Sequence, residues 1–253
     1  MAKNIIFYFS GTGNSLAAAK RIARQLGDCE VVFMKGAFTP AARYERMGFV
    51  LPCYAGGAPK PAMEFLKNMP LTGGSADYVF SVVTCNQMGG DTSFMLDQAL
   101  RQKGLRLHYA KSVRMVGNYV IQYPIPHGAE ERLQNADGQL QTIAAEIEQG
   151  AETKPPRQHL YFTAFYGIGN RFFHYKEKQL RASGACAGCG LCAQLCPVGN
   201  IAMQDGKPKF LHKDCTNCLA CLHWCPNAAI DCGKATARRG RYHHPDVKAG
   251  ELM

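Results

Sequence analysis

The chain carries CAGCGLCAQLCP at residues 186–197 and CTNCLACLHWCP at residues 215–226. Both stretches have the spacing C-x₂-C-x₂-C-x₃-C-P. The likeness continues past the prolines, where Cys196-Pro-Val-Gly-Asn-Ile201 matches Cys225-Pro-Asn-Ala-Ala-Ile230. A repeat of this kind predicts two copies of one short unit, packed together around an approximate two-fold axis.

The cysteine spacing is typical of iron–sulfur ligation. Three thiols at i, i+3 and i+6 let a short loop wrap one corner of a 4Fe–4S cube, and the fourth cysteine of such a run ligates the other cluster. The sequence therefore predicts two interlocked 4Fe–4S clusters. One would be held by Cys186, Cys189, Cys192 and Cys225. The other would be held by Cys215, Cys218, Cys221 and Cys196.

Other uses of these cysteines fit less well. Structural zinc usually takes two C-x₂-C pairs, without a packed triple followed by Cys-Pro. A disulfide framework needs an oxidising compartment, whereas residues 1–9 read as a strand and not as a signal peptide. We therefore expect a reducing, cytoplasmic setting, and low-potential clusters suggest an anaerobic host. The four remaining cysteines are expected to be buried thiols: Cys29, Cys53, Cys85 and Cys232.

Length and charge indicate how the chain is divided. With 253 residues it suits two domains, for which we expect bounds of 1–152 and 183–253, joined by an aromatic and basic linker at 153–182. The net charge is +10, and residues 154–184 alone carry six basic side chains against one acidic. Charge concentrated in a linker, without an aromatic nucleic-acid module, argues against nucleic-acid binding. No apolar run reaches the ~18–20 residues of a transmembrane segment.

The N-terminal half alternates between two kinds of pattern. Buried-strand patterns occur at about 4–9, 30–34, 47–53, 78–84 and 105–116. Helical periodicity occurs at 16–26, 60–68, 92–103 and 129–149. This alternation predicts an α/β fold with a doubly wound, five-stranded parallel sheet. Such sheets bind ligands outside the carboxyl ends of their strands, where the strand order reverses.

The first loop at that edge is typical of a phosphate site. It reads Ser10-Gly11-Thr12-Gly13-Asn14-Ser15. Its hydroxyls, glycines and amides at a helix N-terminus suit a terminal phosphate. It is neither a Walker loop, because no lysine follows the glycines, nor a dinucleotide fingerprint, because Leu16 takes the third glycine position. The alternative is an ordinary N-capped helix.

Two further loops could hold a flat heteroaromatic ring. The second loop supplies Pro52, Tyr54, Ala55, Gly56 and Gly57. There Tyr54 could lie against the ring, and the two glycines would permit a peptide flip that turns a carbonyl toward a flavin N5–H. The third loop supplies Cys85, Asn86, Gly89 and Gly90, which could bind the polar edge of the ring. The alternative for the second loop is a plain glycine turn with a packed tyrosine.

These loops resemble the flavodoxin family, whose phosphate motif (T/S)-x-T-G-x-(T/S) is matched at residues 10–15. The whole chain is similar to the family that joins a flavodoxin-like domain to a C-terminal two-cluster 4Fe–4S ferredoxin domain, and residues 115–119 and 241–245 also look like it. The resemblance implies bound FMN and a role in electron transfer. The third loop lacks the family's second aromatic wall, for which Tyr119 and Tyr123 are candidates. Flavodoxins are also strongly acidic, whereas residues 1–153 carry 15 basic and 13 acidic side chains.

The linker and the tail allow two interpretations each. The linker is rich in aromatic residues: Tyr161, Phe162, Phe165, Tyr166, Phe172, Phe173 and Tyr175. It is expected to be a helix that packs the domains together, the alternative being a docking surface for a partner or a membrane face. The basic tail at 233–253 is expected to wrap over its own domain or to be mobile. His243 and His244 are expected to be solvated and not to form a metal site.

The cofactors define the leading function. We expect an iron–sulfur flavoprotein that passes electrons between FMN and two 4Fe–4S clusters and on to a redox partner protein. No catalytic residue, acid–base pair or nicotinamide fingerprint is recognised, so whether it is also an enzyme stays open, as does the oligomeric state. The alternatives are a self-contained FMN-dependent reductase of a small oxidant and a module whose clusters only brace the fold.

Overall fold

The computed structural model describes residues 3–40 and 43–253, apart from the side chains of residues 170–176. Its larger part is a sheet of five parallel strands: β1 (Asn4–Tyr8), β2 (Cys29–Phe33), β3 (Tyr44–Pro52), β4 (Ala76–Cys85) and β5 (Tyr109–Arg114). The strands are ordered β2-β1-β3-β4-β5. This is the flavodoxin-like doubly wound order, which reverses between β1 and β3. The predicted fold class is confirmed.

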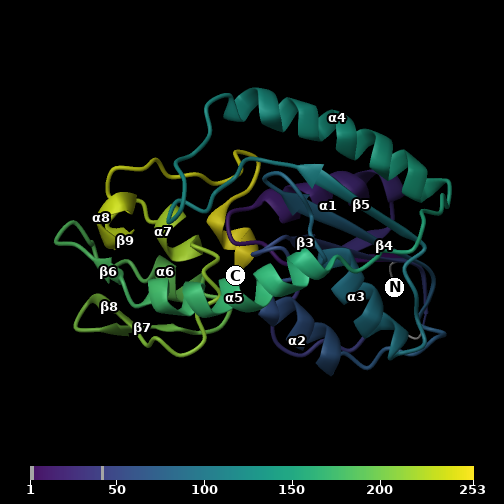
Figure 1. Cartoon of the computed structure of the whole chain (residues 1–253), viewed down its shortest axis with the longest axis horizontal. Coiled ribbons are helices and arrows are strands. Elements are labelled where there is room, and N and C mark those ends of the chain that lie inside the picture. The colour runs from purple at the N-terminus through teal and green to yellow at the C-terminus, as the bar shows by residue number, and fades with distance from the viewer. Residues whose placement is uncertain (1–2, 41–42) are drawn as a thin grey trace.

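Helices cover both faces of the sheet (Figure 1). They are α1 (Asn14–Leu26), α2 (Lys60–Asn68), α3 (Thr92–Arg101) and α4 (Ala129–Glu148). Alternating side chains of β1 explain this arrangement, since Ile6 packs with α1 and α4, while Ile5 and Phe7 pack with α2 and α3. Strands buried on both faces are continuous apolar runs, which is why the sequence reveals them.

One strand is shorter than the sequence pattern predicts. The apolar run at 105–116 contains only β5, Tyr109–Arg114. Residues 105–108 form the return from α3, where Gly104 has a φ of +76° and Leu105 N–H bonds to Leu100 O. Leu105 and Leu107 are buried in the core without pairing in the sheet. Burial therefore extends beyond the strand.

The C-terminal part is small and built on short elements. It contains β6 (Leu180–Ala182), α6 (Leu191–Gln194), β7 (Ile201–Gln204), β8 (Lys207–Phe210), α7 (Ala220–His223), β9 (Ile230–Cys232) and α8 (Gly233–Thr236). Strand β6 pairs with β9 and β7 pairs with β8, both antiparallel. Each cysteine run leads into a one-turn helix, α6 or α7, which matches the internal repeat of the sequence.

The linker contains helix α5 (Leu160–Glu177), which runs between the sheet and the C-terminal part (Figure 1). Its N-terminus is fixed by Asp91, the N-cap residue of α3, whose carboxylate accepts bonds from His159 N–H at 3.0 Å and Thr163 Oγ1–H at 2.8 Å. A carboxylate at a helix N-terminus is favourable because it pairs with the positive end of the helix dipole. Of the aromatic stretch, Phe172, Phe173 and Tyr175 lie outside the described side chains, as do Arg171 and Lys176.

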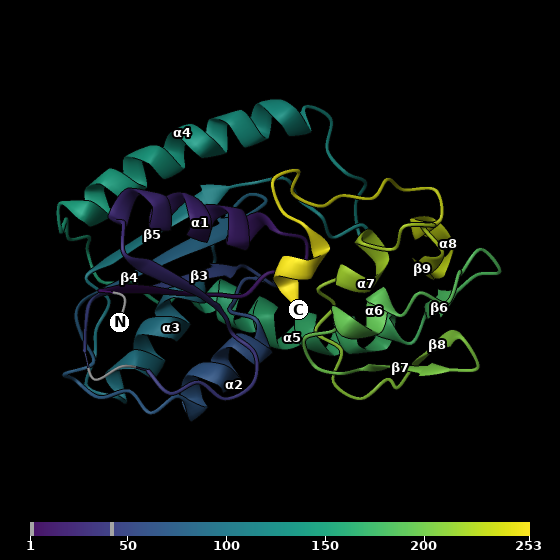
Figure 2. The same cartoon turned by 180° about the vertical axis from the view of Figure 1, so that it is seen from behind.

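The tail follows a path that the sequence did not predict (Figure 2). Instead of staying on its own domain, it crosses to the sheet, where His244 N–H bonds to Thr12 O at 2.8 Å and Tyr242 OH bonds to Asn14 Oδ1 at 2.6 Å. Val247 and Leu252, at the 3₁₀ helix η1 (Ala249–Leu252), join the core beside α1. Burial of these side chains gives the crossing a hydrophobic driving force.

The two adjacent histidines of the tail differ in exposure. His243 is exposed, as expected, and stacks on Trp224 with ring centroids 4.2 Å apart, whereas His244 is buried. Across the described residues, no helix combines the length and the apolar character needed to cross a membrane.

Candidate cofactor site

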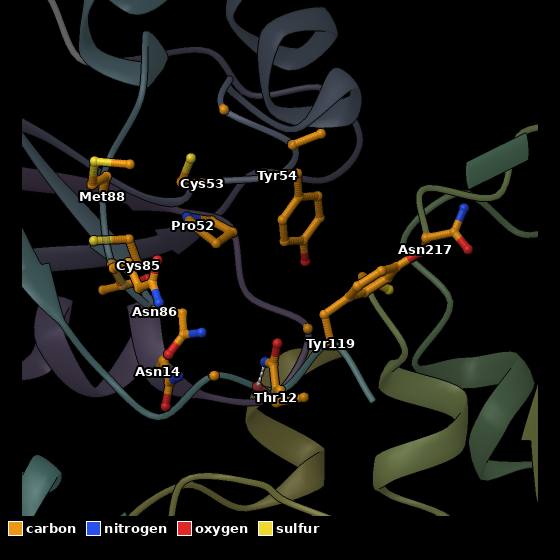
Figure 3. Close-up of a pocket in the computed structure, with 18 of the residues that line it drawn as sticks. Thr12, Asn14, Pro52, Cys53, Tyr54, Cys85, Asn86, Met88, Tyr119 and Asn217 are labelled. Atoms are coloured by element: carbon orange, nitrogen blue, oxygen red, sulfur yellow. Dashed lines mark hydrogen bonds between the residues drawn. The ribbon is translucent and has the colours of Figure 1, made fainter. Parts of the chain in front are cut away.

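A cavity of about 350 Å³ lies at the carboxyl ends of the central strands, at the point where the strand order reverses. Its volume falls within the roughly 300–1,000 Å³ of ligand pockets. Figure 3 shows Tyr54 and Tyr119 beside the cavity, with Thr12 and Asn14 on one side and Pro52, Cys85 and Asn86 on another. Eleven of the expected binding residues line it: Ser10, Gly11, Thr12, Asn14, Ser15, Pro52, Tyr54, Ala55, Gly56, Cys85 and Asn86.

The first loop leaves the start of α1 without a side-chain cap. The N-cap residue is Gly13, with a φ of +97°, and no side-chain hydrogen bond caps the helix. Neither Asn14 nor Ser15 acts as the cap, because Asn14 Nδ2 bonds to Val116 O at 3.0 Å and Ser15 Oγ bonds to Thr84 Oγ1 at 2.8 Å. First-turn N–H groups at an uncapped helix N-terminus are suited to bind an anion.

The loop's own side chains are held in place by the protein. Ser10 Oγ accepts the Gly13 N–H at 3.0 Å, and Thr12 Oγ1 bonds to Asn118 Nδ2. The cavity lining contains no Lys, Arg or His among the described residues. The site is therefore neutral, with backbone amides and hydroxyls as its donors. These residues fit a terminal phosphate that is bound without being transferred.

The second loop closes into a tight turn. Tyr54 N–H bonds to Gly57 O at 2.8 Å, and Gly57 N–H bonds back to Tyr54 O at 3.0 Å. Gly56 takes a φ of +84°, and its carbonyl accepts the Asp91 N–H at 2.7 Å. In this structure the Gly56 carbonyl is therefore bonded within the protein, and a peptide flip here would have to break that bond.

Tyr54 belongs to the second loop, and its side chain lies near the C-terminal part. Burial raises the pKa of Tyr54 well above 10, and electrostatic interaction with the nearby Cys218 and Cys215 raises it further. The phenol therefore stays neutral, and it can lie against an aromatic ligand without carrying charge.

The third loop lines the cavity with a partly different set of residues than expected. Cys85 and Asn86 line it as predicted, and Gln87 and Met88 line it without having been predicted. Arg132 Nη1 from α4 fixes the orientation of Asn86 by donating to its Oδ1 at 2.6 Å. Gly89 and Gly90 do not line the cavity, and neither do Gly13 and Gly57. Close packing explains why glycine occupies positions 57 and 90. A Cβ at Gly57 would collide with the Tyr166 ring, and a Cβ at Gly90 would collide with the Gly56 carbonyl.

Two further segments complete the wall. The loop after β5 supplies Val116, Gly117, Asn118, Tyr119, Gln122 and Tyr123. Tyr119 and Tyr123, the two candidates for a second aromatic wall, thus both line the cavity. Helix α5 adds Tyr161, Phe162 and Phe165, which the sequence analysis did not assign to the site. The signal in the sequence was the aromatic stretch of the linker, although Tyr161 and Phe165 stay exposed at the rim of the cavity.

The C-terminal part forms the remaining side of the cavity. Thr216, Asn217 and Cys218 line it, so the second cysteine run and the first loop face the same space. The two parts are in close contact here. A Cβ on Gly11 would lie 2.6 Å from Cys218 O, and Trp224 Nε1–H donates to Gly11 O at 3.0 Å.

The eight paired-run cysteines surround two smaller voids. Cys186, Cys189, Cys192 and Cys225 line one of them. Cys196, Cys215, Cys218 and Cys221 line the other. The structure thus brings together the two sets that the spacing predicts, with the fourth cysteine of each run crossing over. Among the described residues, no three His, Cys, Asp or Glu side chains are placed to hold a single metal ion.

The other four cysteines differ in burial. Cys85 and Cys232 are buried, whereas Cys29 and Cys53 are only partly buried. Burial raises the pKa of Cys85 to about 11, so this thiol is protonated at neutral pH. The expectation of four buried thiols therefore holds for two of them.

Comparisons with known proteins agree with this geometry. Residues 178–226 match the model of a 4Fe–4S dicluster domain. One curated relative, a component of the ion-translocating oxidoreductase complex of Methanosarcina acetivorans, is 35% identical over 60 residues, which is 23% of this chain and 23% of that protein. The matched region thus spans about a quarter of the length of this curated relative.

Solved structures similar to the chain include two redox proteins. Flavodoxin of Megasphaera elsdenii is 19% identical, with a TM-score of 0.37 over 54% of this chain and 98% of its own. Rubredoxin oxygen:oxidoreductase of Desulfovibrio gigas is 15% identical, with a TM-score of 0.40 over 59% of this chain and 37% of its own. Because these TM-scores lie below 0.5, the fold class depends on the strand order itself. The chain joins a flavodoxin-like sheet to a C-terminal 4Fe–4S dicluster domain.

Proposed function

We propose that this protein is an electron-transfer flavoprotein that holds FMN in the cavity and two 4Fe–4S clusters in the four-cysteine voids, and that it exchanges electrons with a redox partner protein. One observation carries the proposal: Cys218 lines both the cavity and a four-cysteine void. A flavin in the cavity would therefore lie next to a cluster ligand, which is the arrangement that direct electron transfer needs.

The residues present suit FMN. The uncapped start of α1 would bind the phosphate, Tyr54 and Tyr119 would flank the ring system, and Asn86 would meet its polar edge. When bound, FMN exchanges two electrons and two protons whereas each cluster exchanges one electron, so a reduced flavin could fill both clusters and release two protons. The protein's own part is to bind and to orient the flavin, with the aromatic residues of α5 along one side of the cavity.

A redox partner protein has support from one comparison. Support comes from the curated relative, whose name describes a component of an oxidoreductase complex and which matches 60 residues, 23% of this chain. For the setting we propose a cytoplasmic location and an anaerobic host, on the cysteine chemistry alone. As domain bounds we propose 1–152 and 183–253 around the linker 153–182.

Anaerobic reductive titration with dithionite tests the function. Bleaching of the flavin absorbance and of the cluster absorbance is expected together, with about four electrons taken up per chain, two by FMN and one by each cluster. Clusters that stay oxidised at excess dithionite would instead indicate a structural role. Uptake by the clusters without any flavin signal would remove the flavoprotein part of the proposal.

A second candidate is a reductase of a small oxidant. It is favoured by the rim of the cavity, where Tyr161 is 71% exposed and Phe165 is 45% exposed, so that a flat molecule could stack there. Steady oxidation of NADH or NADPH by the purified protein with a small quinone would promote this candidate. Electron uptake without turnover would leave the carrier function in place.

A further inference from the structure

The two four-cysteine voids lie in different surroundings. The void of Cys196, Cys215, Cys218 and Cys221, here called the inner site, shares Cys218 with the cofactor cavity. Much of its remaining lining is buried, including Asn200, Leu219 and Ala220. The inner site is therefore buried within the protein and adjoins the cavity, so it is the site that would face a bound flavin.

The void of Cys186, Cys189, Cys192 and Cys225, here called the outer site, reaches the surface. Cys189 is exposed, and Met203 in its lining is 38% exposed. Pro226 and Asn227 are exposed on its other side. None of its lining residues belongs to the cofactor cavity. Electrons that reach an outer cluster therefore leave through this face.

Positive charge lies beside the outer site. Pro208 lines it, and the neighbouring Lys207 and Lys209 on β8 are both exposed. Lys207 Nζ donates to Cys186 O at 2.8 Å, which places its ammonium against the cysteine loop itself. The one acidic side chain on this hairpin is Asp205, at the turn between β7 and β8. Basic side chains around an exposed redox centre attract and orient an acidic partner.

We infer that the two cluster sites stand in a fixed order, the inner one against the flavin and the outer one at the surface, and that Lys207 and Lys209 make the outer site the docking face for an acidic one-electron carrier protein. Each encounter passes one electron between the outer cluster and the carrier's metal centre, without a bond change or a proton. This order rests on the proposed function, since it assigns places to the cofactors proposed there.

Paramagnetic proton NMR tests the order without any mutation. The β-CH₂ protons of cluster-bound cysteines are shifted by the iron, so the two clusters give separate sets of lines. Removal of FMN and its restoration are expected to move the lines of Cys215, Cys218 and Cys221 and to leave those of Cys186, Cys189 and Cys192 in place. A larger response of the second set would overturn the order. Absence of FMN from the protein would instead contradict the proposed function, by a different observation.

Stopped-flow reduction of rubredoxin, a small acidic one-electron acceptor, tests the docking face. The probe is mixed with the anaerobically reduced holo-protein at low ionic strength. The double variant Lys207→Glu/Lys209→Glu is expected to react about tenfold more slowly or worse, and added salt should slow the unmodified protein. Lys209→Glu alone should show part of the effect and avoids the contact with Cys186, in case the double variant disturbs the cluster.

A matched variant controls for net charge. Lys3→Glu/Lys67→Glu makes the same change at the opposite edge of the sheet, because Lys3 precedes β1 and Lys67 lies in the last turn of α2. Its rate is expected to equal that of the unmodified protein. Equal slowing in both double variants, or an unchanged rate in Lys207→Glu/Lys209→Glu with full iron content, would rule out this docking face.

Discussion

At the scale of single residues, the contact between Gly11 and Cys218 joins the two cofactor regions. Gly11 belongs to the proposed phosphate loop, and Cys218 is a proposed ligand of the inner cluster. A Cβ at position 11 would lie 2.6 Å from Cys218 O and 3.0 Å from Cys218 Cβ. Only glycine permits this approach, so the residue serves the interface between the two parts as well as its own loop.

Gly11→Ala tests that contact. Because the backbone has to move at a packed interface, we expect a loss of about 1–3 kcal/mol in unfolding free energy together with weaker retention of FMN. Thermal unfolding and the flavin-to-protein ratio after desalting measure both effects. The matched control is Gly138→Ala in α4, where a Cβ meets nothing within 4 Å. This control should raise the unfolding free energy by about 1 kcal/mol, because alanine is favoured over glycine inside a helix. Full flavin retention by Gly11→Ala would contradict the described interface.

Cys189→Ser separates the outer site from the flavin. Cys189 lines the outer void and is not part of the cofactor cavity. We expect a lower iron content or an altered outer cluster, with FMN still bound in full. Iron and flavin analysis of one sample measures both, and Cys218→Ser is the matched variant that should also weaken FMN binding. Equal flavin loss in the two variants would show that the sites are not distinct.

At the scale of elements, helix α5 holds the aromatic wall of the cavity and depends on Asp91 for its position. The Asp91 side chain is 3% exposed, and both of its oxygens accept bonds from the start of α5. Along the helix, Tyr166 OH reaches Ala58 O at 2.8 Å, and Phe162 lies over Gly56. Polar bonds at one end and ring packing along its length thus fix α5 against the second loop.

Asp91→Asn should loosen this helix. The amide places a donor where an acceptor is needed and removes the charge from the helix N-terminus, at a cost of about 1–2 kcal/mol. We expect faster proteolysis within residues 160–168 and faster release of FMN. Asp77→Asn is the control, because Asp77 pairs with Arg43 at the surface, where such a pair contributes little. Equal protease resistance of Asp91→Asn and the unmodified protein would contradict this anchoring.

The docking of the tail should depend on pH through His244. Burial lowers the pKa of the His244 imidazole from 6.5; nearby Asp246 raises it and Lys20 lowers it. The unfolded tail therefore takes up a proton more readily than the docked one as pH falls below 6.5, so stability is complete above that pH and is lost below it. Hydrogen exchange of residues 241–253 should be faster at pH 5.5 than at pH 8, after correction for the intrinsic exchange rate at each pH. In His244→Asn, which cannot titrate, the difference should be smaller, and an equal difference would exclude His244 as its source.

At the scale of the whole molecule, the sequence predicts each part better than it predicts their contact. Buried strands and cysteine spacing are local patterns, so the sheet and the two cysteine sets are visible in the chain itself. The cavity wall built from Tyr161, Phe162 and Cys218 is not local, because these residues reach the first loop only after the linker folds back. The path of the tail could not be predicted for the same reason. Its hydrogen bond from Tyr242 OH to Asn14 Oδ1 joins residues that are 228 positions apart in the sequence.

The role of two short segments becomes visible only in the structure. In the sequence, residues 115–119 and 241–245 contain no recognisable binding or catalytic motif. In the structure, Asn118 O faces His223 Nε2 at 2.7 Å, and the 241–245 segment supplies the bonds to Thr12 and Asn14. Both segments therefore fasten the C-terminal part to the first loop.

Anaerobic analysis of iron, sulfide and released flavin on one sample tests the central claim most directly. Two 4Fe–4S clusters and one flavin predict about eight irons, about eight sulfides and one FMN per chain. Zinc in place of iron, or a sample with neither sulfide nor flavin, would contradict it.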